Sequence, residues 1–262
     1  MAARQLLAHH HQYGIESRQV CDVGVSVEWR MQAARIAELL QPFLSPLPGA
    51  FHSELDRRSG EEPAVLPATQ LQHISMYIDI LTRWNGRINL TAIRDEEEIV
   101  TRHFGESLFA ARCLFPEAAS AFQARGRVRL ADLGSGAGFP GIPIKLWAPS
   151  ILLTLIESNH KKATFLRELC RALTLTDIDI QNVRGEEVGQ TYDDVTLRAV
   201  ENFAQALRVA AGLMTPQGRL ALLIGSSQLD SVRSALPDMI WQAPLTVPLS
   251  QSRVLLVGNG RT

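Results

Sequence analysis

The sequence predicts a doubly wound α/β domain with a helical addition at its N-terminal end. After Gly126, short apolar runs alternate with segments of helical spacing, and the connections between them are short. The first of these runs leads into a glycine-rich stretch, "LADLGSGAGFPGIP". Alternating strands and helices with short connections are typical of a parallel sheet that helices cover on both faces. With 262 residues, of which 46% are apolar, the chain can bury a large core.

We expect three parts along the chain: an N-terminal extension over residues 1–64, a helical cap over 65–125 and the α/β domain over 126–262. In the extension, one helix is predicted over 27–40. The stretch "QPFLSPLPGAFHSELDRRSGEEP" that follows this helix is rich in breakers and charges, which is typical of a linker. The extension is therefore expected to be partly flexible.

Neither the histidines nor the cysteines predict a metal site or a disulfide framework. The histidines at positions 9–11 are adjacent, so they cannot share one face of a helix or strand, and a polar tail is the better interpretation. The wide spacing of the cysteines fits small buried side chains in a reducing compartment. The three cysteines are Cys21, Cys113 and Cys170.

Two helices are predicted in the cap. In "TQLQHISMYIDILTRWN", apolar residues recur at helical spacing from Leu71 to Trp84 and form a stripe that faces the core. The acidic run from Asp95 to Glu98 marks the start of the second helix, because carboxylates stabilise the positive end of a helix dipole. We prefer this interpretation of the acidic run to a metal site.

The α/β domain is predicted from alternating patterns that begin with the strand before the glycine-rich loop. The predicted strands cover 128–133, 151–156, 178–183, 194–198, 219–224, 239–247 and 253–257. The predicted helices cover 141–147, 159–174, 201–214 and 228–235. We expect the glycine-rich loop to bind a ligand, because ligands of open α/β sheets bind at the carboxyl ends of the strands.

Composition limits the partners and the location of the protein. A net charge of −1 and a pI near 6.7 give no overall attraction to nucleic acid, so any RNA contact needs a local basic face. The N-terminus has no apolar run long enough for a signal peptide, and no apolar span of 18 residues occurs. We therefore expect a soluble, cytoplasmic protein.

The glycine-rich loop can be aligned with two motifs. The segment from Gly136 to Gly141 reads G-x-G-x-x-G, the fingerprint of dinucleotide-binding folds. The segment from Asp132 to Gly138 reads D-x-G-x-G-x-G. This second reading fits the strand better, since the alternating apolar residues of "VRLADL" end at Leu133 and the turn can begin at once.

The charges around the loop favour a cationic ligand over a phosphate. A phosphate-binding loop holds an anion with helix-end amides, whereas Asp132 suits a ligand with a sulfonium cation and an amino-acid tail. Glu157 ends the second strand, where a carboxylate accepts hydrogen bonds from a ribose diol. Gly185 and Glu186 follow the third strand, where an adenine ring would lie. These features predict S-adenosylmethionine. An NAD-dependent oxidoreductase is disfavoured by the loop reading and by the lack of a Tyr-x-x-x-Lys pair.

Several stretches together resemble one known family. They are "DLGSGAGFPGIP", "ESNHKKATFL", "VRGEE", "LRAV" and "WNGRINLTAIRDEEEIVTRHFGESL". In these motifs the chain resembles the small-subunit ribosomal RNA methyltransferase G family, also called glucose-inhibited division protein B. The resemblance runs from about Leu71 to the C-terminus and leaves out residues 1–64.

The resemblance implies a Rossmann-like class I methyltransferase fold and a specific reaction. The enzyme would transfer a methyl group from S-adenosylmethionine to N7 of a guanine in 16S rRNA of the small ribosomal subunit. We accordingly expect a monomer that binds 16S rRNA or the small subunit, without a metal or a membrane. Arg198 in "LRAV" would be the catalytic residue, close to cofactor and substrate, although a structural ion pair is the alternative for this side chain.

Two sets of site residues follow. The expected cofactor contacts are Asp132, Gly134, Gly136, Gly138, Phe139, Glu157, Gly185, Glu186 and Arg198. The expected RNA contacts are Arg94, Arg102, His103, Lys161 and Lys162. For the two lysines, a solvated helical face remains an open alternative.

The chain departs from the family pattern where the RNA would bind. Ile224 stands where the family usually has lysine, Glu106 replaces an aspartate in "HFGES", and the last strand lacks the usual closing lysines. These departures keep open a second hypothesis, a catalytically weakened or non-catalytic relative associated with the ribosome. If the site is only weakened, restoring lysine at position 224 should raise turnover.

Overall fold

The computed structural model describes residues 31–45, 63–116, 127–200 and 202–260. The histidines at positions 9–11, Cys21 and residues 46–62 of the predicted linker lie outside these ranges. Within the described ranges, no helix combines the length and the apolar character needed to cross a membrane.

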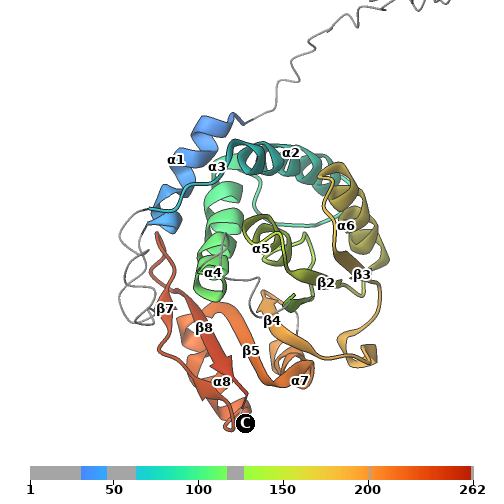
Figure 1. The fold of residues 1–262 in the computed structure, drawn as a ribbon, viewed down its shortest axis with the longest axis vertical. Helices are drawn as coiled ribbons and strands as arrows, with labels where there is room; N and C mark the ends of the chain where they lie inside the picture. Colours follow the sequence, from blue (N-terminus) through green and yellow to red (C-terminus); the bar gives the residue numbers. More distant parts are fainter. Residues whose placement is uncertain (1–30, 46–62, 117–126, 201, 261–262) are drawn as a thin grey trace, which may run out of the picture.

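An eight-stranded sheet forms the centre of the molecule, in the order β3-β2-β1-β4-β5-β8-β6, with β7 also paired to β8 (Figure 1). The strands from β1 to β5 run parallel, and β8 is antiparallel to β5. Their bounds are β1 Arg129–Leu133, β2 Leu152–Ile156, β3 Ile178–Gln181, β4 Tyr192–Arg198, β5 Met214–Gly225, β6 Ile240–Trp241, β7 Leu245–Thr246 and β8 Arg253–Asn259. The predicted α/β fold is confirmed, but the segment predicted as one strand over 239–247 forms two short strands.

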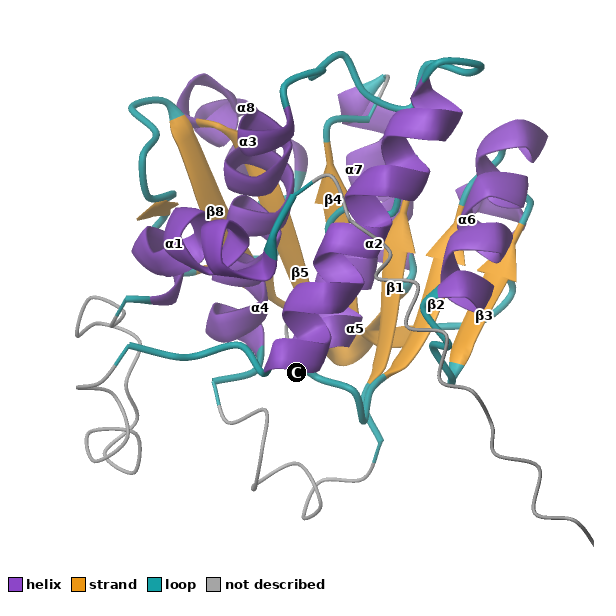
Figure 2. Ribbon diagram, turned by 90° about the horizontal axis from the view of Figure 1, so that it is seen from above, coloured by secondary structure: helices purple, strands orange, loops and turns teal. Residues whose placement is uncertain are grey.

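Helices cover both faces of the sheet, as Figure 2 shows. On one face lie α4 (Glu106–Leu114), α5 (Gly141–Trp147) and α6 (His160–Ala172), and their apolar side chains share one buried cluster with the sheet. On the other face, α7 (Phe203–Gly212) and α8 (Leu229–Ala235) pack into a second cluster. The central strands are buried on both sides, which explains their nearly continuous apolar sequences.

The cap extends the first face. Helix α2 (Ala68–Asn85) buries the predicted apolar stripe, and Asp95 caps the next helix by accepting a hydrogen bond from the Glu98 backbone N–H at 2.8 Å. That helix begins as α3 (Glu96–Glu98), continues as the π-helical segment η3 (Ile99–Gly105) and ends as α4. The start near Asp95 is confirmed, whereas the π-helical segment was not predicted. Such segments are frequent at functional sites.

The one described helix of the N-terminal extension is part of the core. Helix α1 covers Ala33–Leu44, several residues later than predicted, because this position turns Ile36, Leu40 and Phe43 inward. A Cβ atom added at Gly105 of η3 would lie 2.5 Å from the Phe43 ring, so the two segments are in close contact. The Arg112 guanidinium of α4 also donates a hydrogen bond to the Phe43 carbonyl at 3.0 Å.

We predict that Phe43→Ala lowers the free energy of unfolding by about 3 to 5 kcal/mol, because it leaves a cavity between α1 and η3. Phe43 is 2% exposed. Urea unfolding followed by circular dichroism would measure the change. Gln41→Ala, on the exposed side of the same helix, is the matched control and should stay within about 0.5 kcal/mol of wild type. Equal stability of all three proteins would contradict the packing of α1.

Candidate active site

A cavity of about 810 Å³ lies at the carboxyl ends of the parallel strands. The loops after β1, β2, β3 and β4 form one side of it, and the cap forms the other. This is the position at which open α/β sheets bind their ligands. Predicted site residues that line the cavity are Arg102, His103, Gly134, Gly136, Phe139, Glu157, Lys162, Gly185, Glu186 and Arg198.

The glycine loop follows the D-x-G-x-G-x-G reading. Gly134, Gly136 and Gly138 all have positive φ angles, of 70°, 56° and 92°, and this backbone conformation favours glycine. A Cβ atom at Gly134 would also lie 2.7 Å from Val200, at the wall of the cavity. Gly141, the last glycine of the dinucleotide reading, instead begins α5. The loop geometry therefore depends on the three glycines of the second reading.

Asp132 in β1 holds the end of the glycine loop by hydrogen bonding. One carboxylate oxygen accepts a hydrogen bond from the Gly141 backbone N–H at 3.1 Å, and the other accepts one from the Thr196 hydroxyl at 2.8 Å. Asp132 is 1% exposed and does not line the cavity, which corrects the expectation that it faces the ligand. The side chain turns toward α5 and β4, beneath the strand end. Burial raises the pKa of its carboxyl group to about 6.

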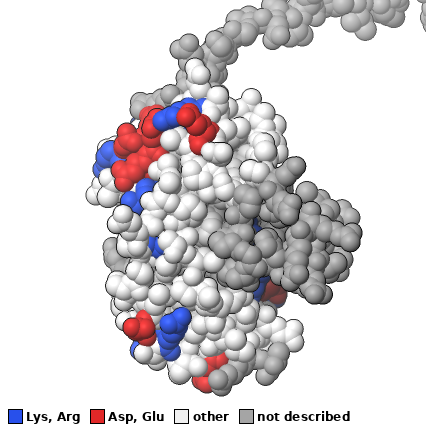
Figure 3. Space-filling model, turned by 90° about the vertical axis from the view of Figure 1, so that its left-hand side faces the viewer, with Lys and Arg blue, Asp and Glu red and all other residues white. Residues whose placement is uncertain are grey.

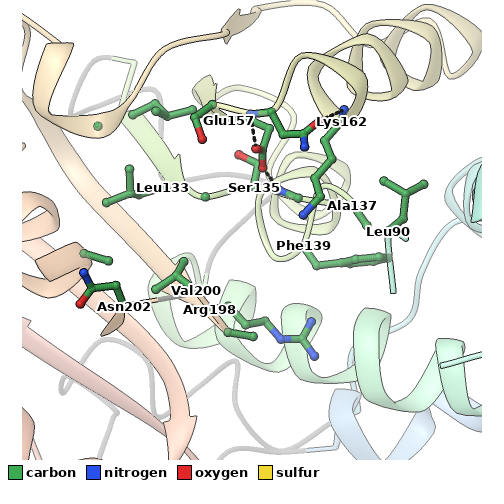
Figure 4. A pocket seen from close by; sticks show the side chains of 18 of the residues that line it. Leu90, Leu133, Ser135, Ala137, Phe139, Glu157, Lys162, Arg198, Val200 and Asn202 are labelled. Carbon is green, nitrogen blue, oxygen red and sulfur yellow. Dashed lines mark hydrogen bonds between the residues drawn. The ribbon is translucent and has the colours of Figure 1, made fainter. Parts of the chain in front are cut away.

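Glu157 is held at the cavity wall by backbone donors. Its Oε2 accepts a hydrogen bond from the Gly136 N–H at 2.9 Å, and its Oε1 accepts one from the Asn159 N–H at 2.7 Å (Figure 4). A carboxylate offers about four acceptor positions, so about two remain for a ligand. Glu157 thus lines the cavity directly after β2, and its contact with a ribose stays a prediction.

The loop after β3 lies close against the sheet because of one glycine. A Cβ atom at Gly185 would lie 2.7 Å from side-chain atoms of both Leu133 and Val209. Glu186, next to it, accepts a hydrogen bond from the Gln205 amide at 2.7 Å. This loop forms an edge of the cavity, where the sequence predicted the adenine.

Arg198 ends β4 with a buried guanidinium group, across the cavity from Glu157 (Figure 4). Its Nη2 donates to the Arg102 carbonyl at 2.7 Å and to the Glu106 carboxylate at 2.9 Å. Its Nη1 is buried and has no hydrogen-bond partner among the described residues. Burial lowers the pKa of Arg198 to about 10, although the Glu106 carboxylate opposes this shift, so the group is charged at neutral pH.

Glu106 joins three guanidinium groups from three parts of the chain. Besides Arg198, it contacts the Nε atoms of Arg102 at 3.1 Å and of Arg253 at 3.0 Å. Its side chain is only 1% exposed. Three cations around one carboxylate leave a local excess of positive charge, as the sequence required for any RNA contact. Neither Arg253 nor this role of Glu106 was predicted.

An aromatic stack forms the wall beside Arg102. The Phe139 ring lies between His103, with ring centroids 4.7 Å apart, and Tyr77, with centroids 5.1 Å apart. His103 Nε2 shares a hydrogen bond of 2.7 Å with the Thr91 hydroxyl. Burial, together with the neighbouring arginines, lowers the pKa of His103 to about 3, so this side chain is neutral at pH 7.

Some predicted residues lie away from the cavity. Lys161, Arg94 and Gly138 do not line it, and Arg94 donates instead to the Asn85 carbonyl at 3.1 Å. Ile224 is 4% exposed and lies in the apolar cluster beneath α7 and α8. In the described part of the chain, no cluster of His, Cys, Asp and Glu could hold a metal ion.

Comparisons with known proteins place the chain among RNA methyltransferases. A family model described as rRNA small subunit methyltransferase G matches residues 70–252. The protein named ribosomal RNA small subunit methyltransferase G from Xylella fastidiosa is 39% identical over 190 residues, which cover 71% of this chain and 84% of that protein. Its namesake from Stenotrophomonas maltophilia is 38% identical over 207 residues, which cover 78% of this chain and 91% of that protein.

Among solved structures, the chain is similar in fold to magnesium protoporphyrin IX methyltransferase from Synechocystis, which was solved with bound SAM. The TM-score is 0.54 at 13% sequence identity, and the match covers 72% of this chain and 97% of that protein. This similarity supports the fold alone.

We predict that burial of Asp132 appears as a pH-dependent difference in stability between wild type and Asp132→Asn. The carboxyl group titrates near pH 3.8 when unfolded and near pH 6 when folded, so the native state binds the extra proton between these values. The free energy of unfolding of wild type should therefore fall, relative to the variant, by roughly 2 to 3 kcal/mol as the pH rises through this interval.

Urea unfolding at pH 4, 5, 6 and 7 would measure this difference. Asp230→Asn, at an exposed position on α8, is the control and should show no such trend. A constant difference between wild type and Asp132→Asn across this range would contradict the raised pKa.

Proposed function

This chain belongs to the rRNA small subunit methyltransferase G family, and from that premise we propose that it transfers a methyl group from S-adenosylmethionine to N7 of a guanine in 16S rRNA. One observation carries the proposal: the glycine loop, Glu157, Gly185 and Arg198 converge on a single cavity inside the matched region. Each of these features lies far from the others in the sequence. Their convergence supports one site for cofactor and substrate.

The cavity suits S-adenosylmethionine along its sheet side. The carboxylate of Glu157 would accept hydrogen bonds from the ribose hydroxyls with its remaining acceptor positions. The loop around Gly134 and Gly136 exposes backbone where the amino-acid part would lie, and Gly185 with Glu186 would border the adenine. The cofactor supplies a methyl group activated by the sulfonium cation.

The chemistry at guanine N7 needs no general base. The N7 atom has an in-plane lone pair and carries no hydrogen, so it can attack the methyl carbon directly. Rate enhancement then comes mainly from holding the two reactants in line. The task of the protein is to orient the guanine.

Arg198 is the residue best placed for this orientation. It is charged, it lines the cavity, and its Nη1 has no partner among the described residues. Arginine commonly donates to guanine O6 and N7. A donor at N7 would occupy the attacking lone pair, so we assign Arg198 to O6. Its ion pair with Glu106 fixes the guanidinium group and is compatible with this role.

The cavity would give the RNA a local basic surface. Five cationic residues line it, against two carboxylates, although the whole chain carries a net charge of −1. The cationic residues are Arg102, Lys162, Arg184, Arg198 and Arg253. This local excess of charge supports a polyanionic substrate.

We expect the purified protein to bind S-adenosylmethionine and Glu157→Ala to bind it about 10- to 100-fold more weakly, since charge-assisted hydrogen bonds to the ligand are lost. Isothermal titration calorimetry would measure both dissociation constants. Glu187→Ala removes a nearby exposed carboxylate that does not line the cavity, so it should bind like wild type. Equal affinity of Glu157→Ala and wild type would exclude the ribose contact.

We expect Arg198→Lys to lower kcat for methyl transfer to small-subunit rRNA on the order of 100-fold, because lysine keeps the charge but not the planar fork. Transfer of labelled methyl from S-adenosylmethionine would report the rate. Arg208→Lys, at an exposed position of α7 outside the cavity, should keep the wild-type rate. A wild-type kcat for Arg198→Lys would rule out this orienting role.

A further inference from the structure

A smaller cavity of about 220 Å³ adjoins the main one. The two cavities share Arg102 and Arg253, so these two side chains lie between them. We call the smaller one the side cavity. The residues that line it include Arg102, Glu106, Leu249, Ser250 and Arg253. Its lining comes from α1, from η3 and the start of α4, and from the connection between β7 and β8 with the first residue of β8.

The donors of the side cavity suit an oxyanion. Glu106 engages Arg253 through Nε, so the two Nη groups of that guanidinium keep four N–H bonds for other acceptors. Arg253 is 25% exposed and Arg102 is 44% exposed, so both groups can reach a ligand from solvent. Fixed guanidinium forks are well matched to phosphate oxygens.

A hydroxyl group adds a further donor. Ser250 Oγ accepts a hydrogen bond from the Arg253 backbone N–H at 3.1 Å. This hydrogen bond holds the hydroxyl oxygen next to Arg253. The hydroxyl proton of Ser250 can therefore be donated to a ligand. Next to it, Leu249 has a φ angle of 60° and is 73% exposed. This left-handed backbone is uncommon for leucine, and such residues cluster at ligand-binding sites.

The charge in the side cavity is local. Figure 3 shows the face with α1, where charged side chains of both signs gather toward the ends and mainly uncharged residues lie between them. No continuous basic surface crosses the described residues visible there. At the side cavity, by contrast, Arg102 and Arg253 share the single buried carboxylate of Glu106 with Arg198. Glu98 approaches Arg102 at 3.7 Å from the rim, and the excess of positive charge remains.

We propose that the side cavity binds a backbone phosphate of the RNA, next to the nucleotide whose guanine enters the main cavity. Arg253 and Arg102 contact the phosphate through their Nη groups, and Ser250 contacts it through its hydroxyl. Because the two arginines also line the main cavity, one RNA strand can occupy both cavities at once. This inference rests on the proposed function, since it takes the main cavity as the site of the target guanine.

The test compares wild type, Arg253→Gln and Arg253→Lys in RNA binding and methyl transfer. Removing one phosphate contact should raise KM for small-subunit rRNA roughly three- to tenfold. It should also make the slope of log affinity against log salt less negative by about 0.7, the value for one contact to single-stranded RNA. Arg253→Lys should regain most of the slope. Arg171→Gln, at the exposed C-terminal end of α6, is the matched charge control and should keep the wild-type slope.

A merely structural Arg253 would give a different result. It would change kcat or the affinity for S-adenosylmethionine through Glu106 and Arg198, but it would leave the salt slope at the wild-type value. That result would overturn the inference. Equal KM and equal slope for Arg253→Gln and wild type would overturn it as well.

Failure of the proposed function would be visible separately. A wild-type protein that binds S-adenosylmethionine and RNA but methylates no rRNA would contradict the reaction. The salt slope would still test the side cavity in that case: a reduced slope for Arg253→Gln supports a phosphate contact, and an unchanged slope excludes it. A wild-type protein without measurable RNA affinity would overturn both proposals.

Discussion

The structure depends on one buried carboxylate. Glu106 is almost fully removed from solvent, and a charge in that position is tolerated only when cations and hydrogen bonds compensate it. The compensation comes from η3, from the end of β4 and from the start of β8, through Arg102, Arg198 and Arg253. Loss of any one partner would leave charge poorly compensated. These ion pairs therefore hold the cap, the central strand β4 and the antiparallel strand β8 together at the site itself.

The glycine loop is held on two sides in a similar way. Asp132 binds the start of α5 from below, and Glu157 binds the middle of the loop from the neighbouring strand. Both carboxylates accept hydrogen bonds from backbone N–H groups, so the shape of the loop is supported by the protein's own groups. A loop that is already ordered loses little conformational entropy when a ligand binds. Asp132 and Glu157 both stand at strand ends in the sequence, but their roles differ. Asp132 is buried beneath the end of its strand, whereas Glu157 lines the cavity.

Local signals explain what the sequence could predict. Short stretches of sequence are enough to predict the alternation of strands and helices. They are also enough to predict the three glycines of the loop and the position of Glu157 at a strand end. The π-helical segment η3 was missed because an apolar period indicates a helix but does not distinguish a π-helical segment within it. The direction of Asp132 depends on Thr196, which lies 64 residues away. Arg253 was missed because its approach to Glu106 requires the antiparallel pairing of β8 with β5.

That pairing also bears on the cation that the family resemblance expected at position 224. Ile224 is buried in the apolar cluster, but the next residue, Gly225, lies opposite Arg253 in the register of β5 with β8. The neighbouring strand therefore brings a guanidinium group to the edge where the lysine was expected. Glutamate at position 106 contacts this group with the same oxygen that contacts Arg102, while its other oxygen contacts Arg198. Glu106 thus lies in a cluster that remains positively charged, and Arg253 of that cluster is paired with the residue that follows Ile224. This weakens the hypothesis that the chain has lost its RNA-binding face.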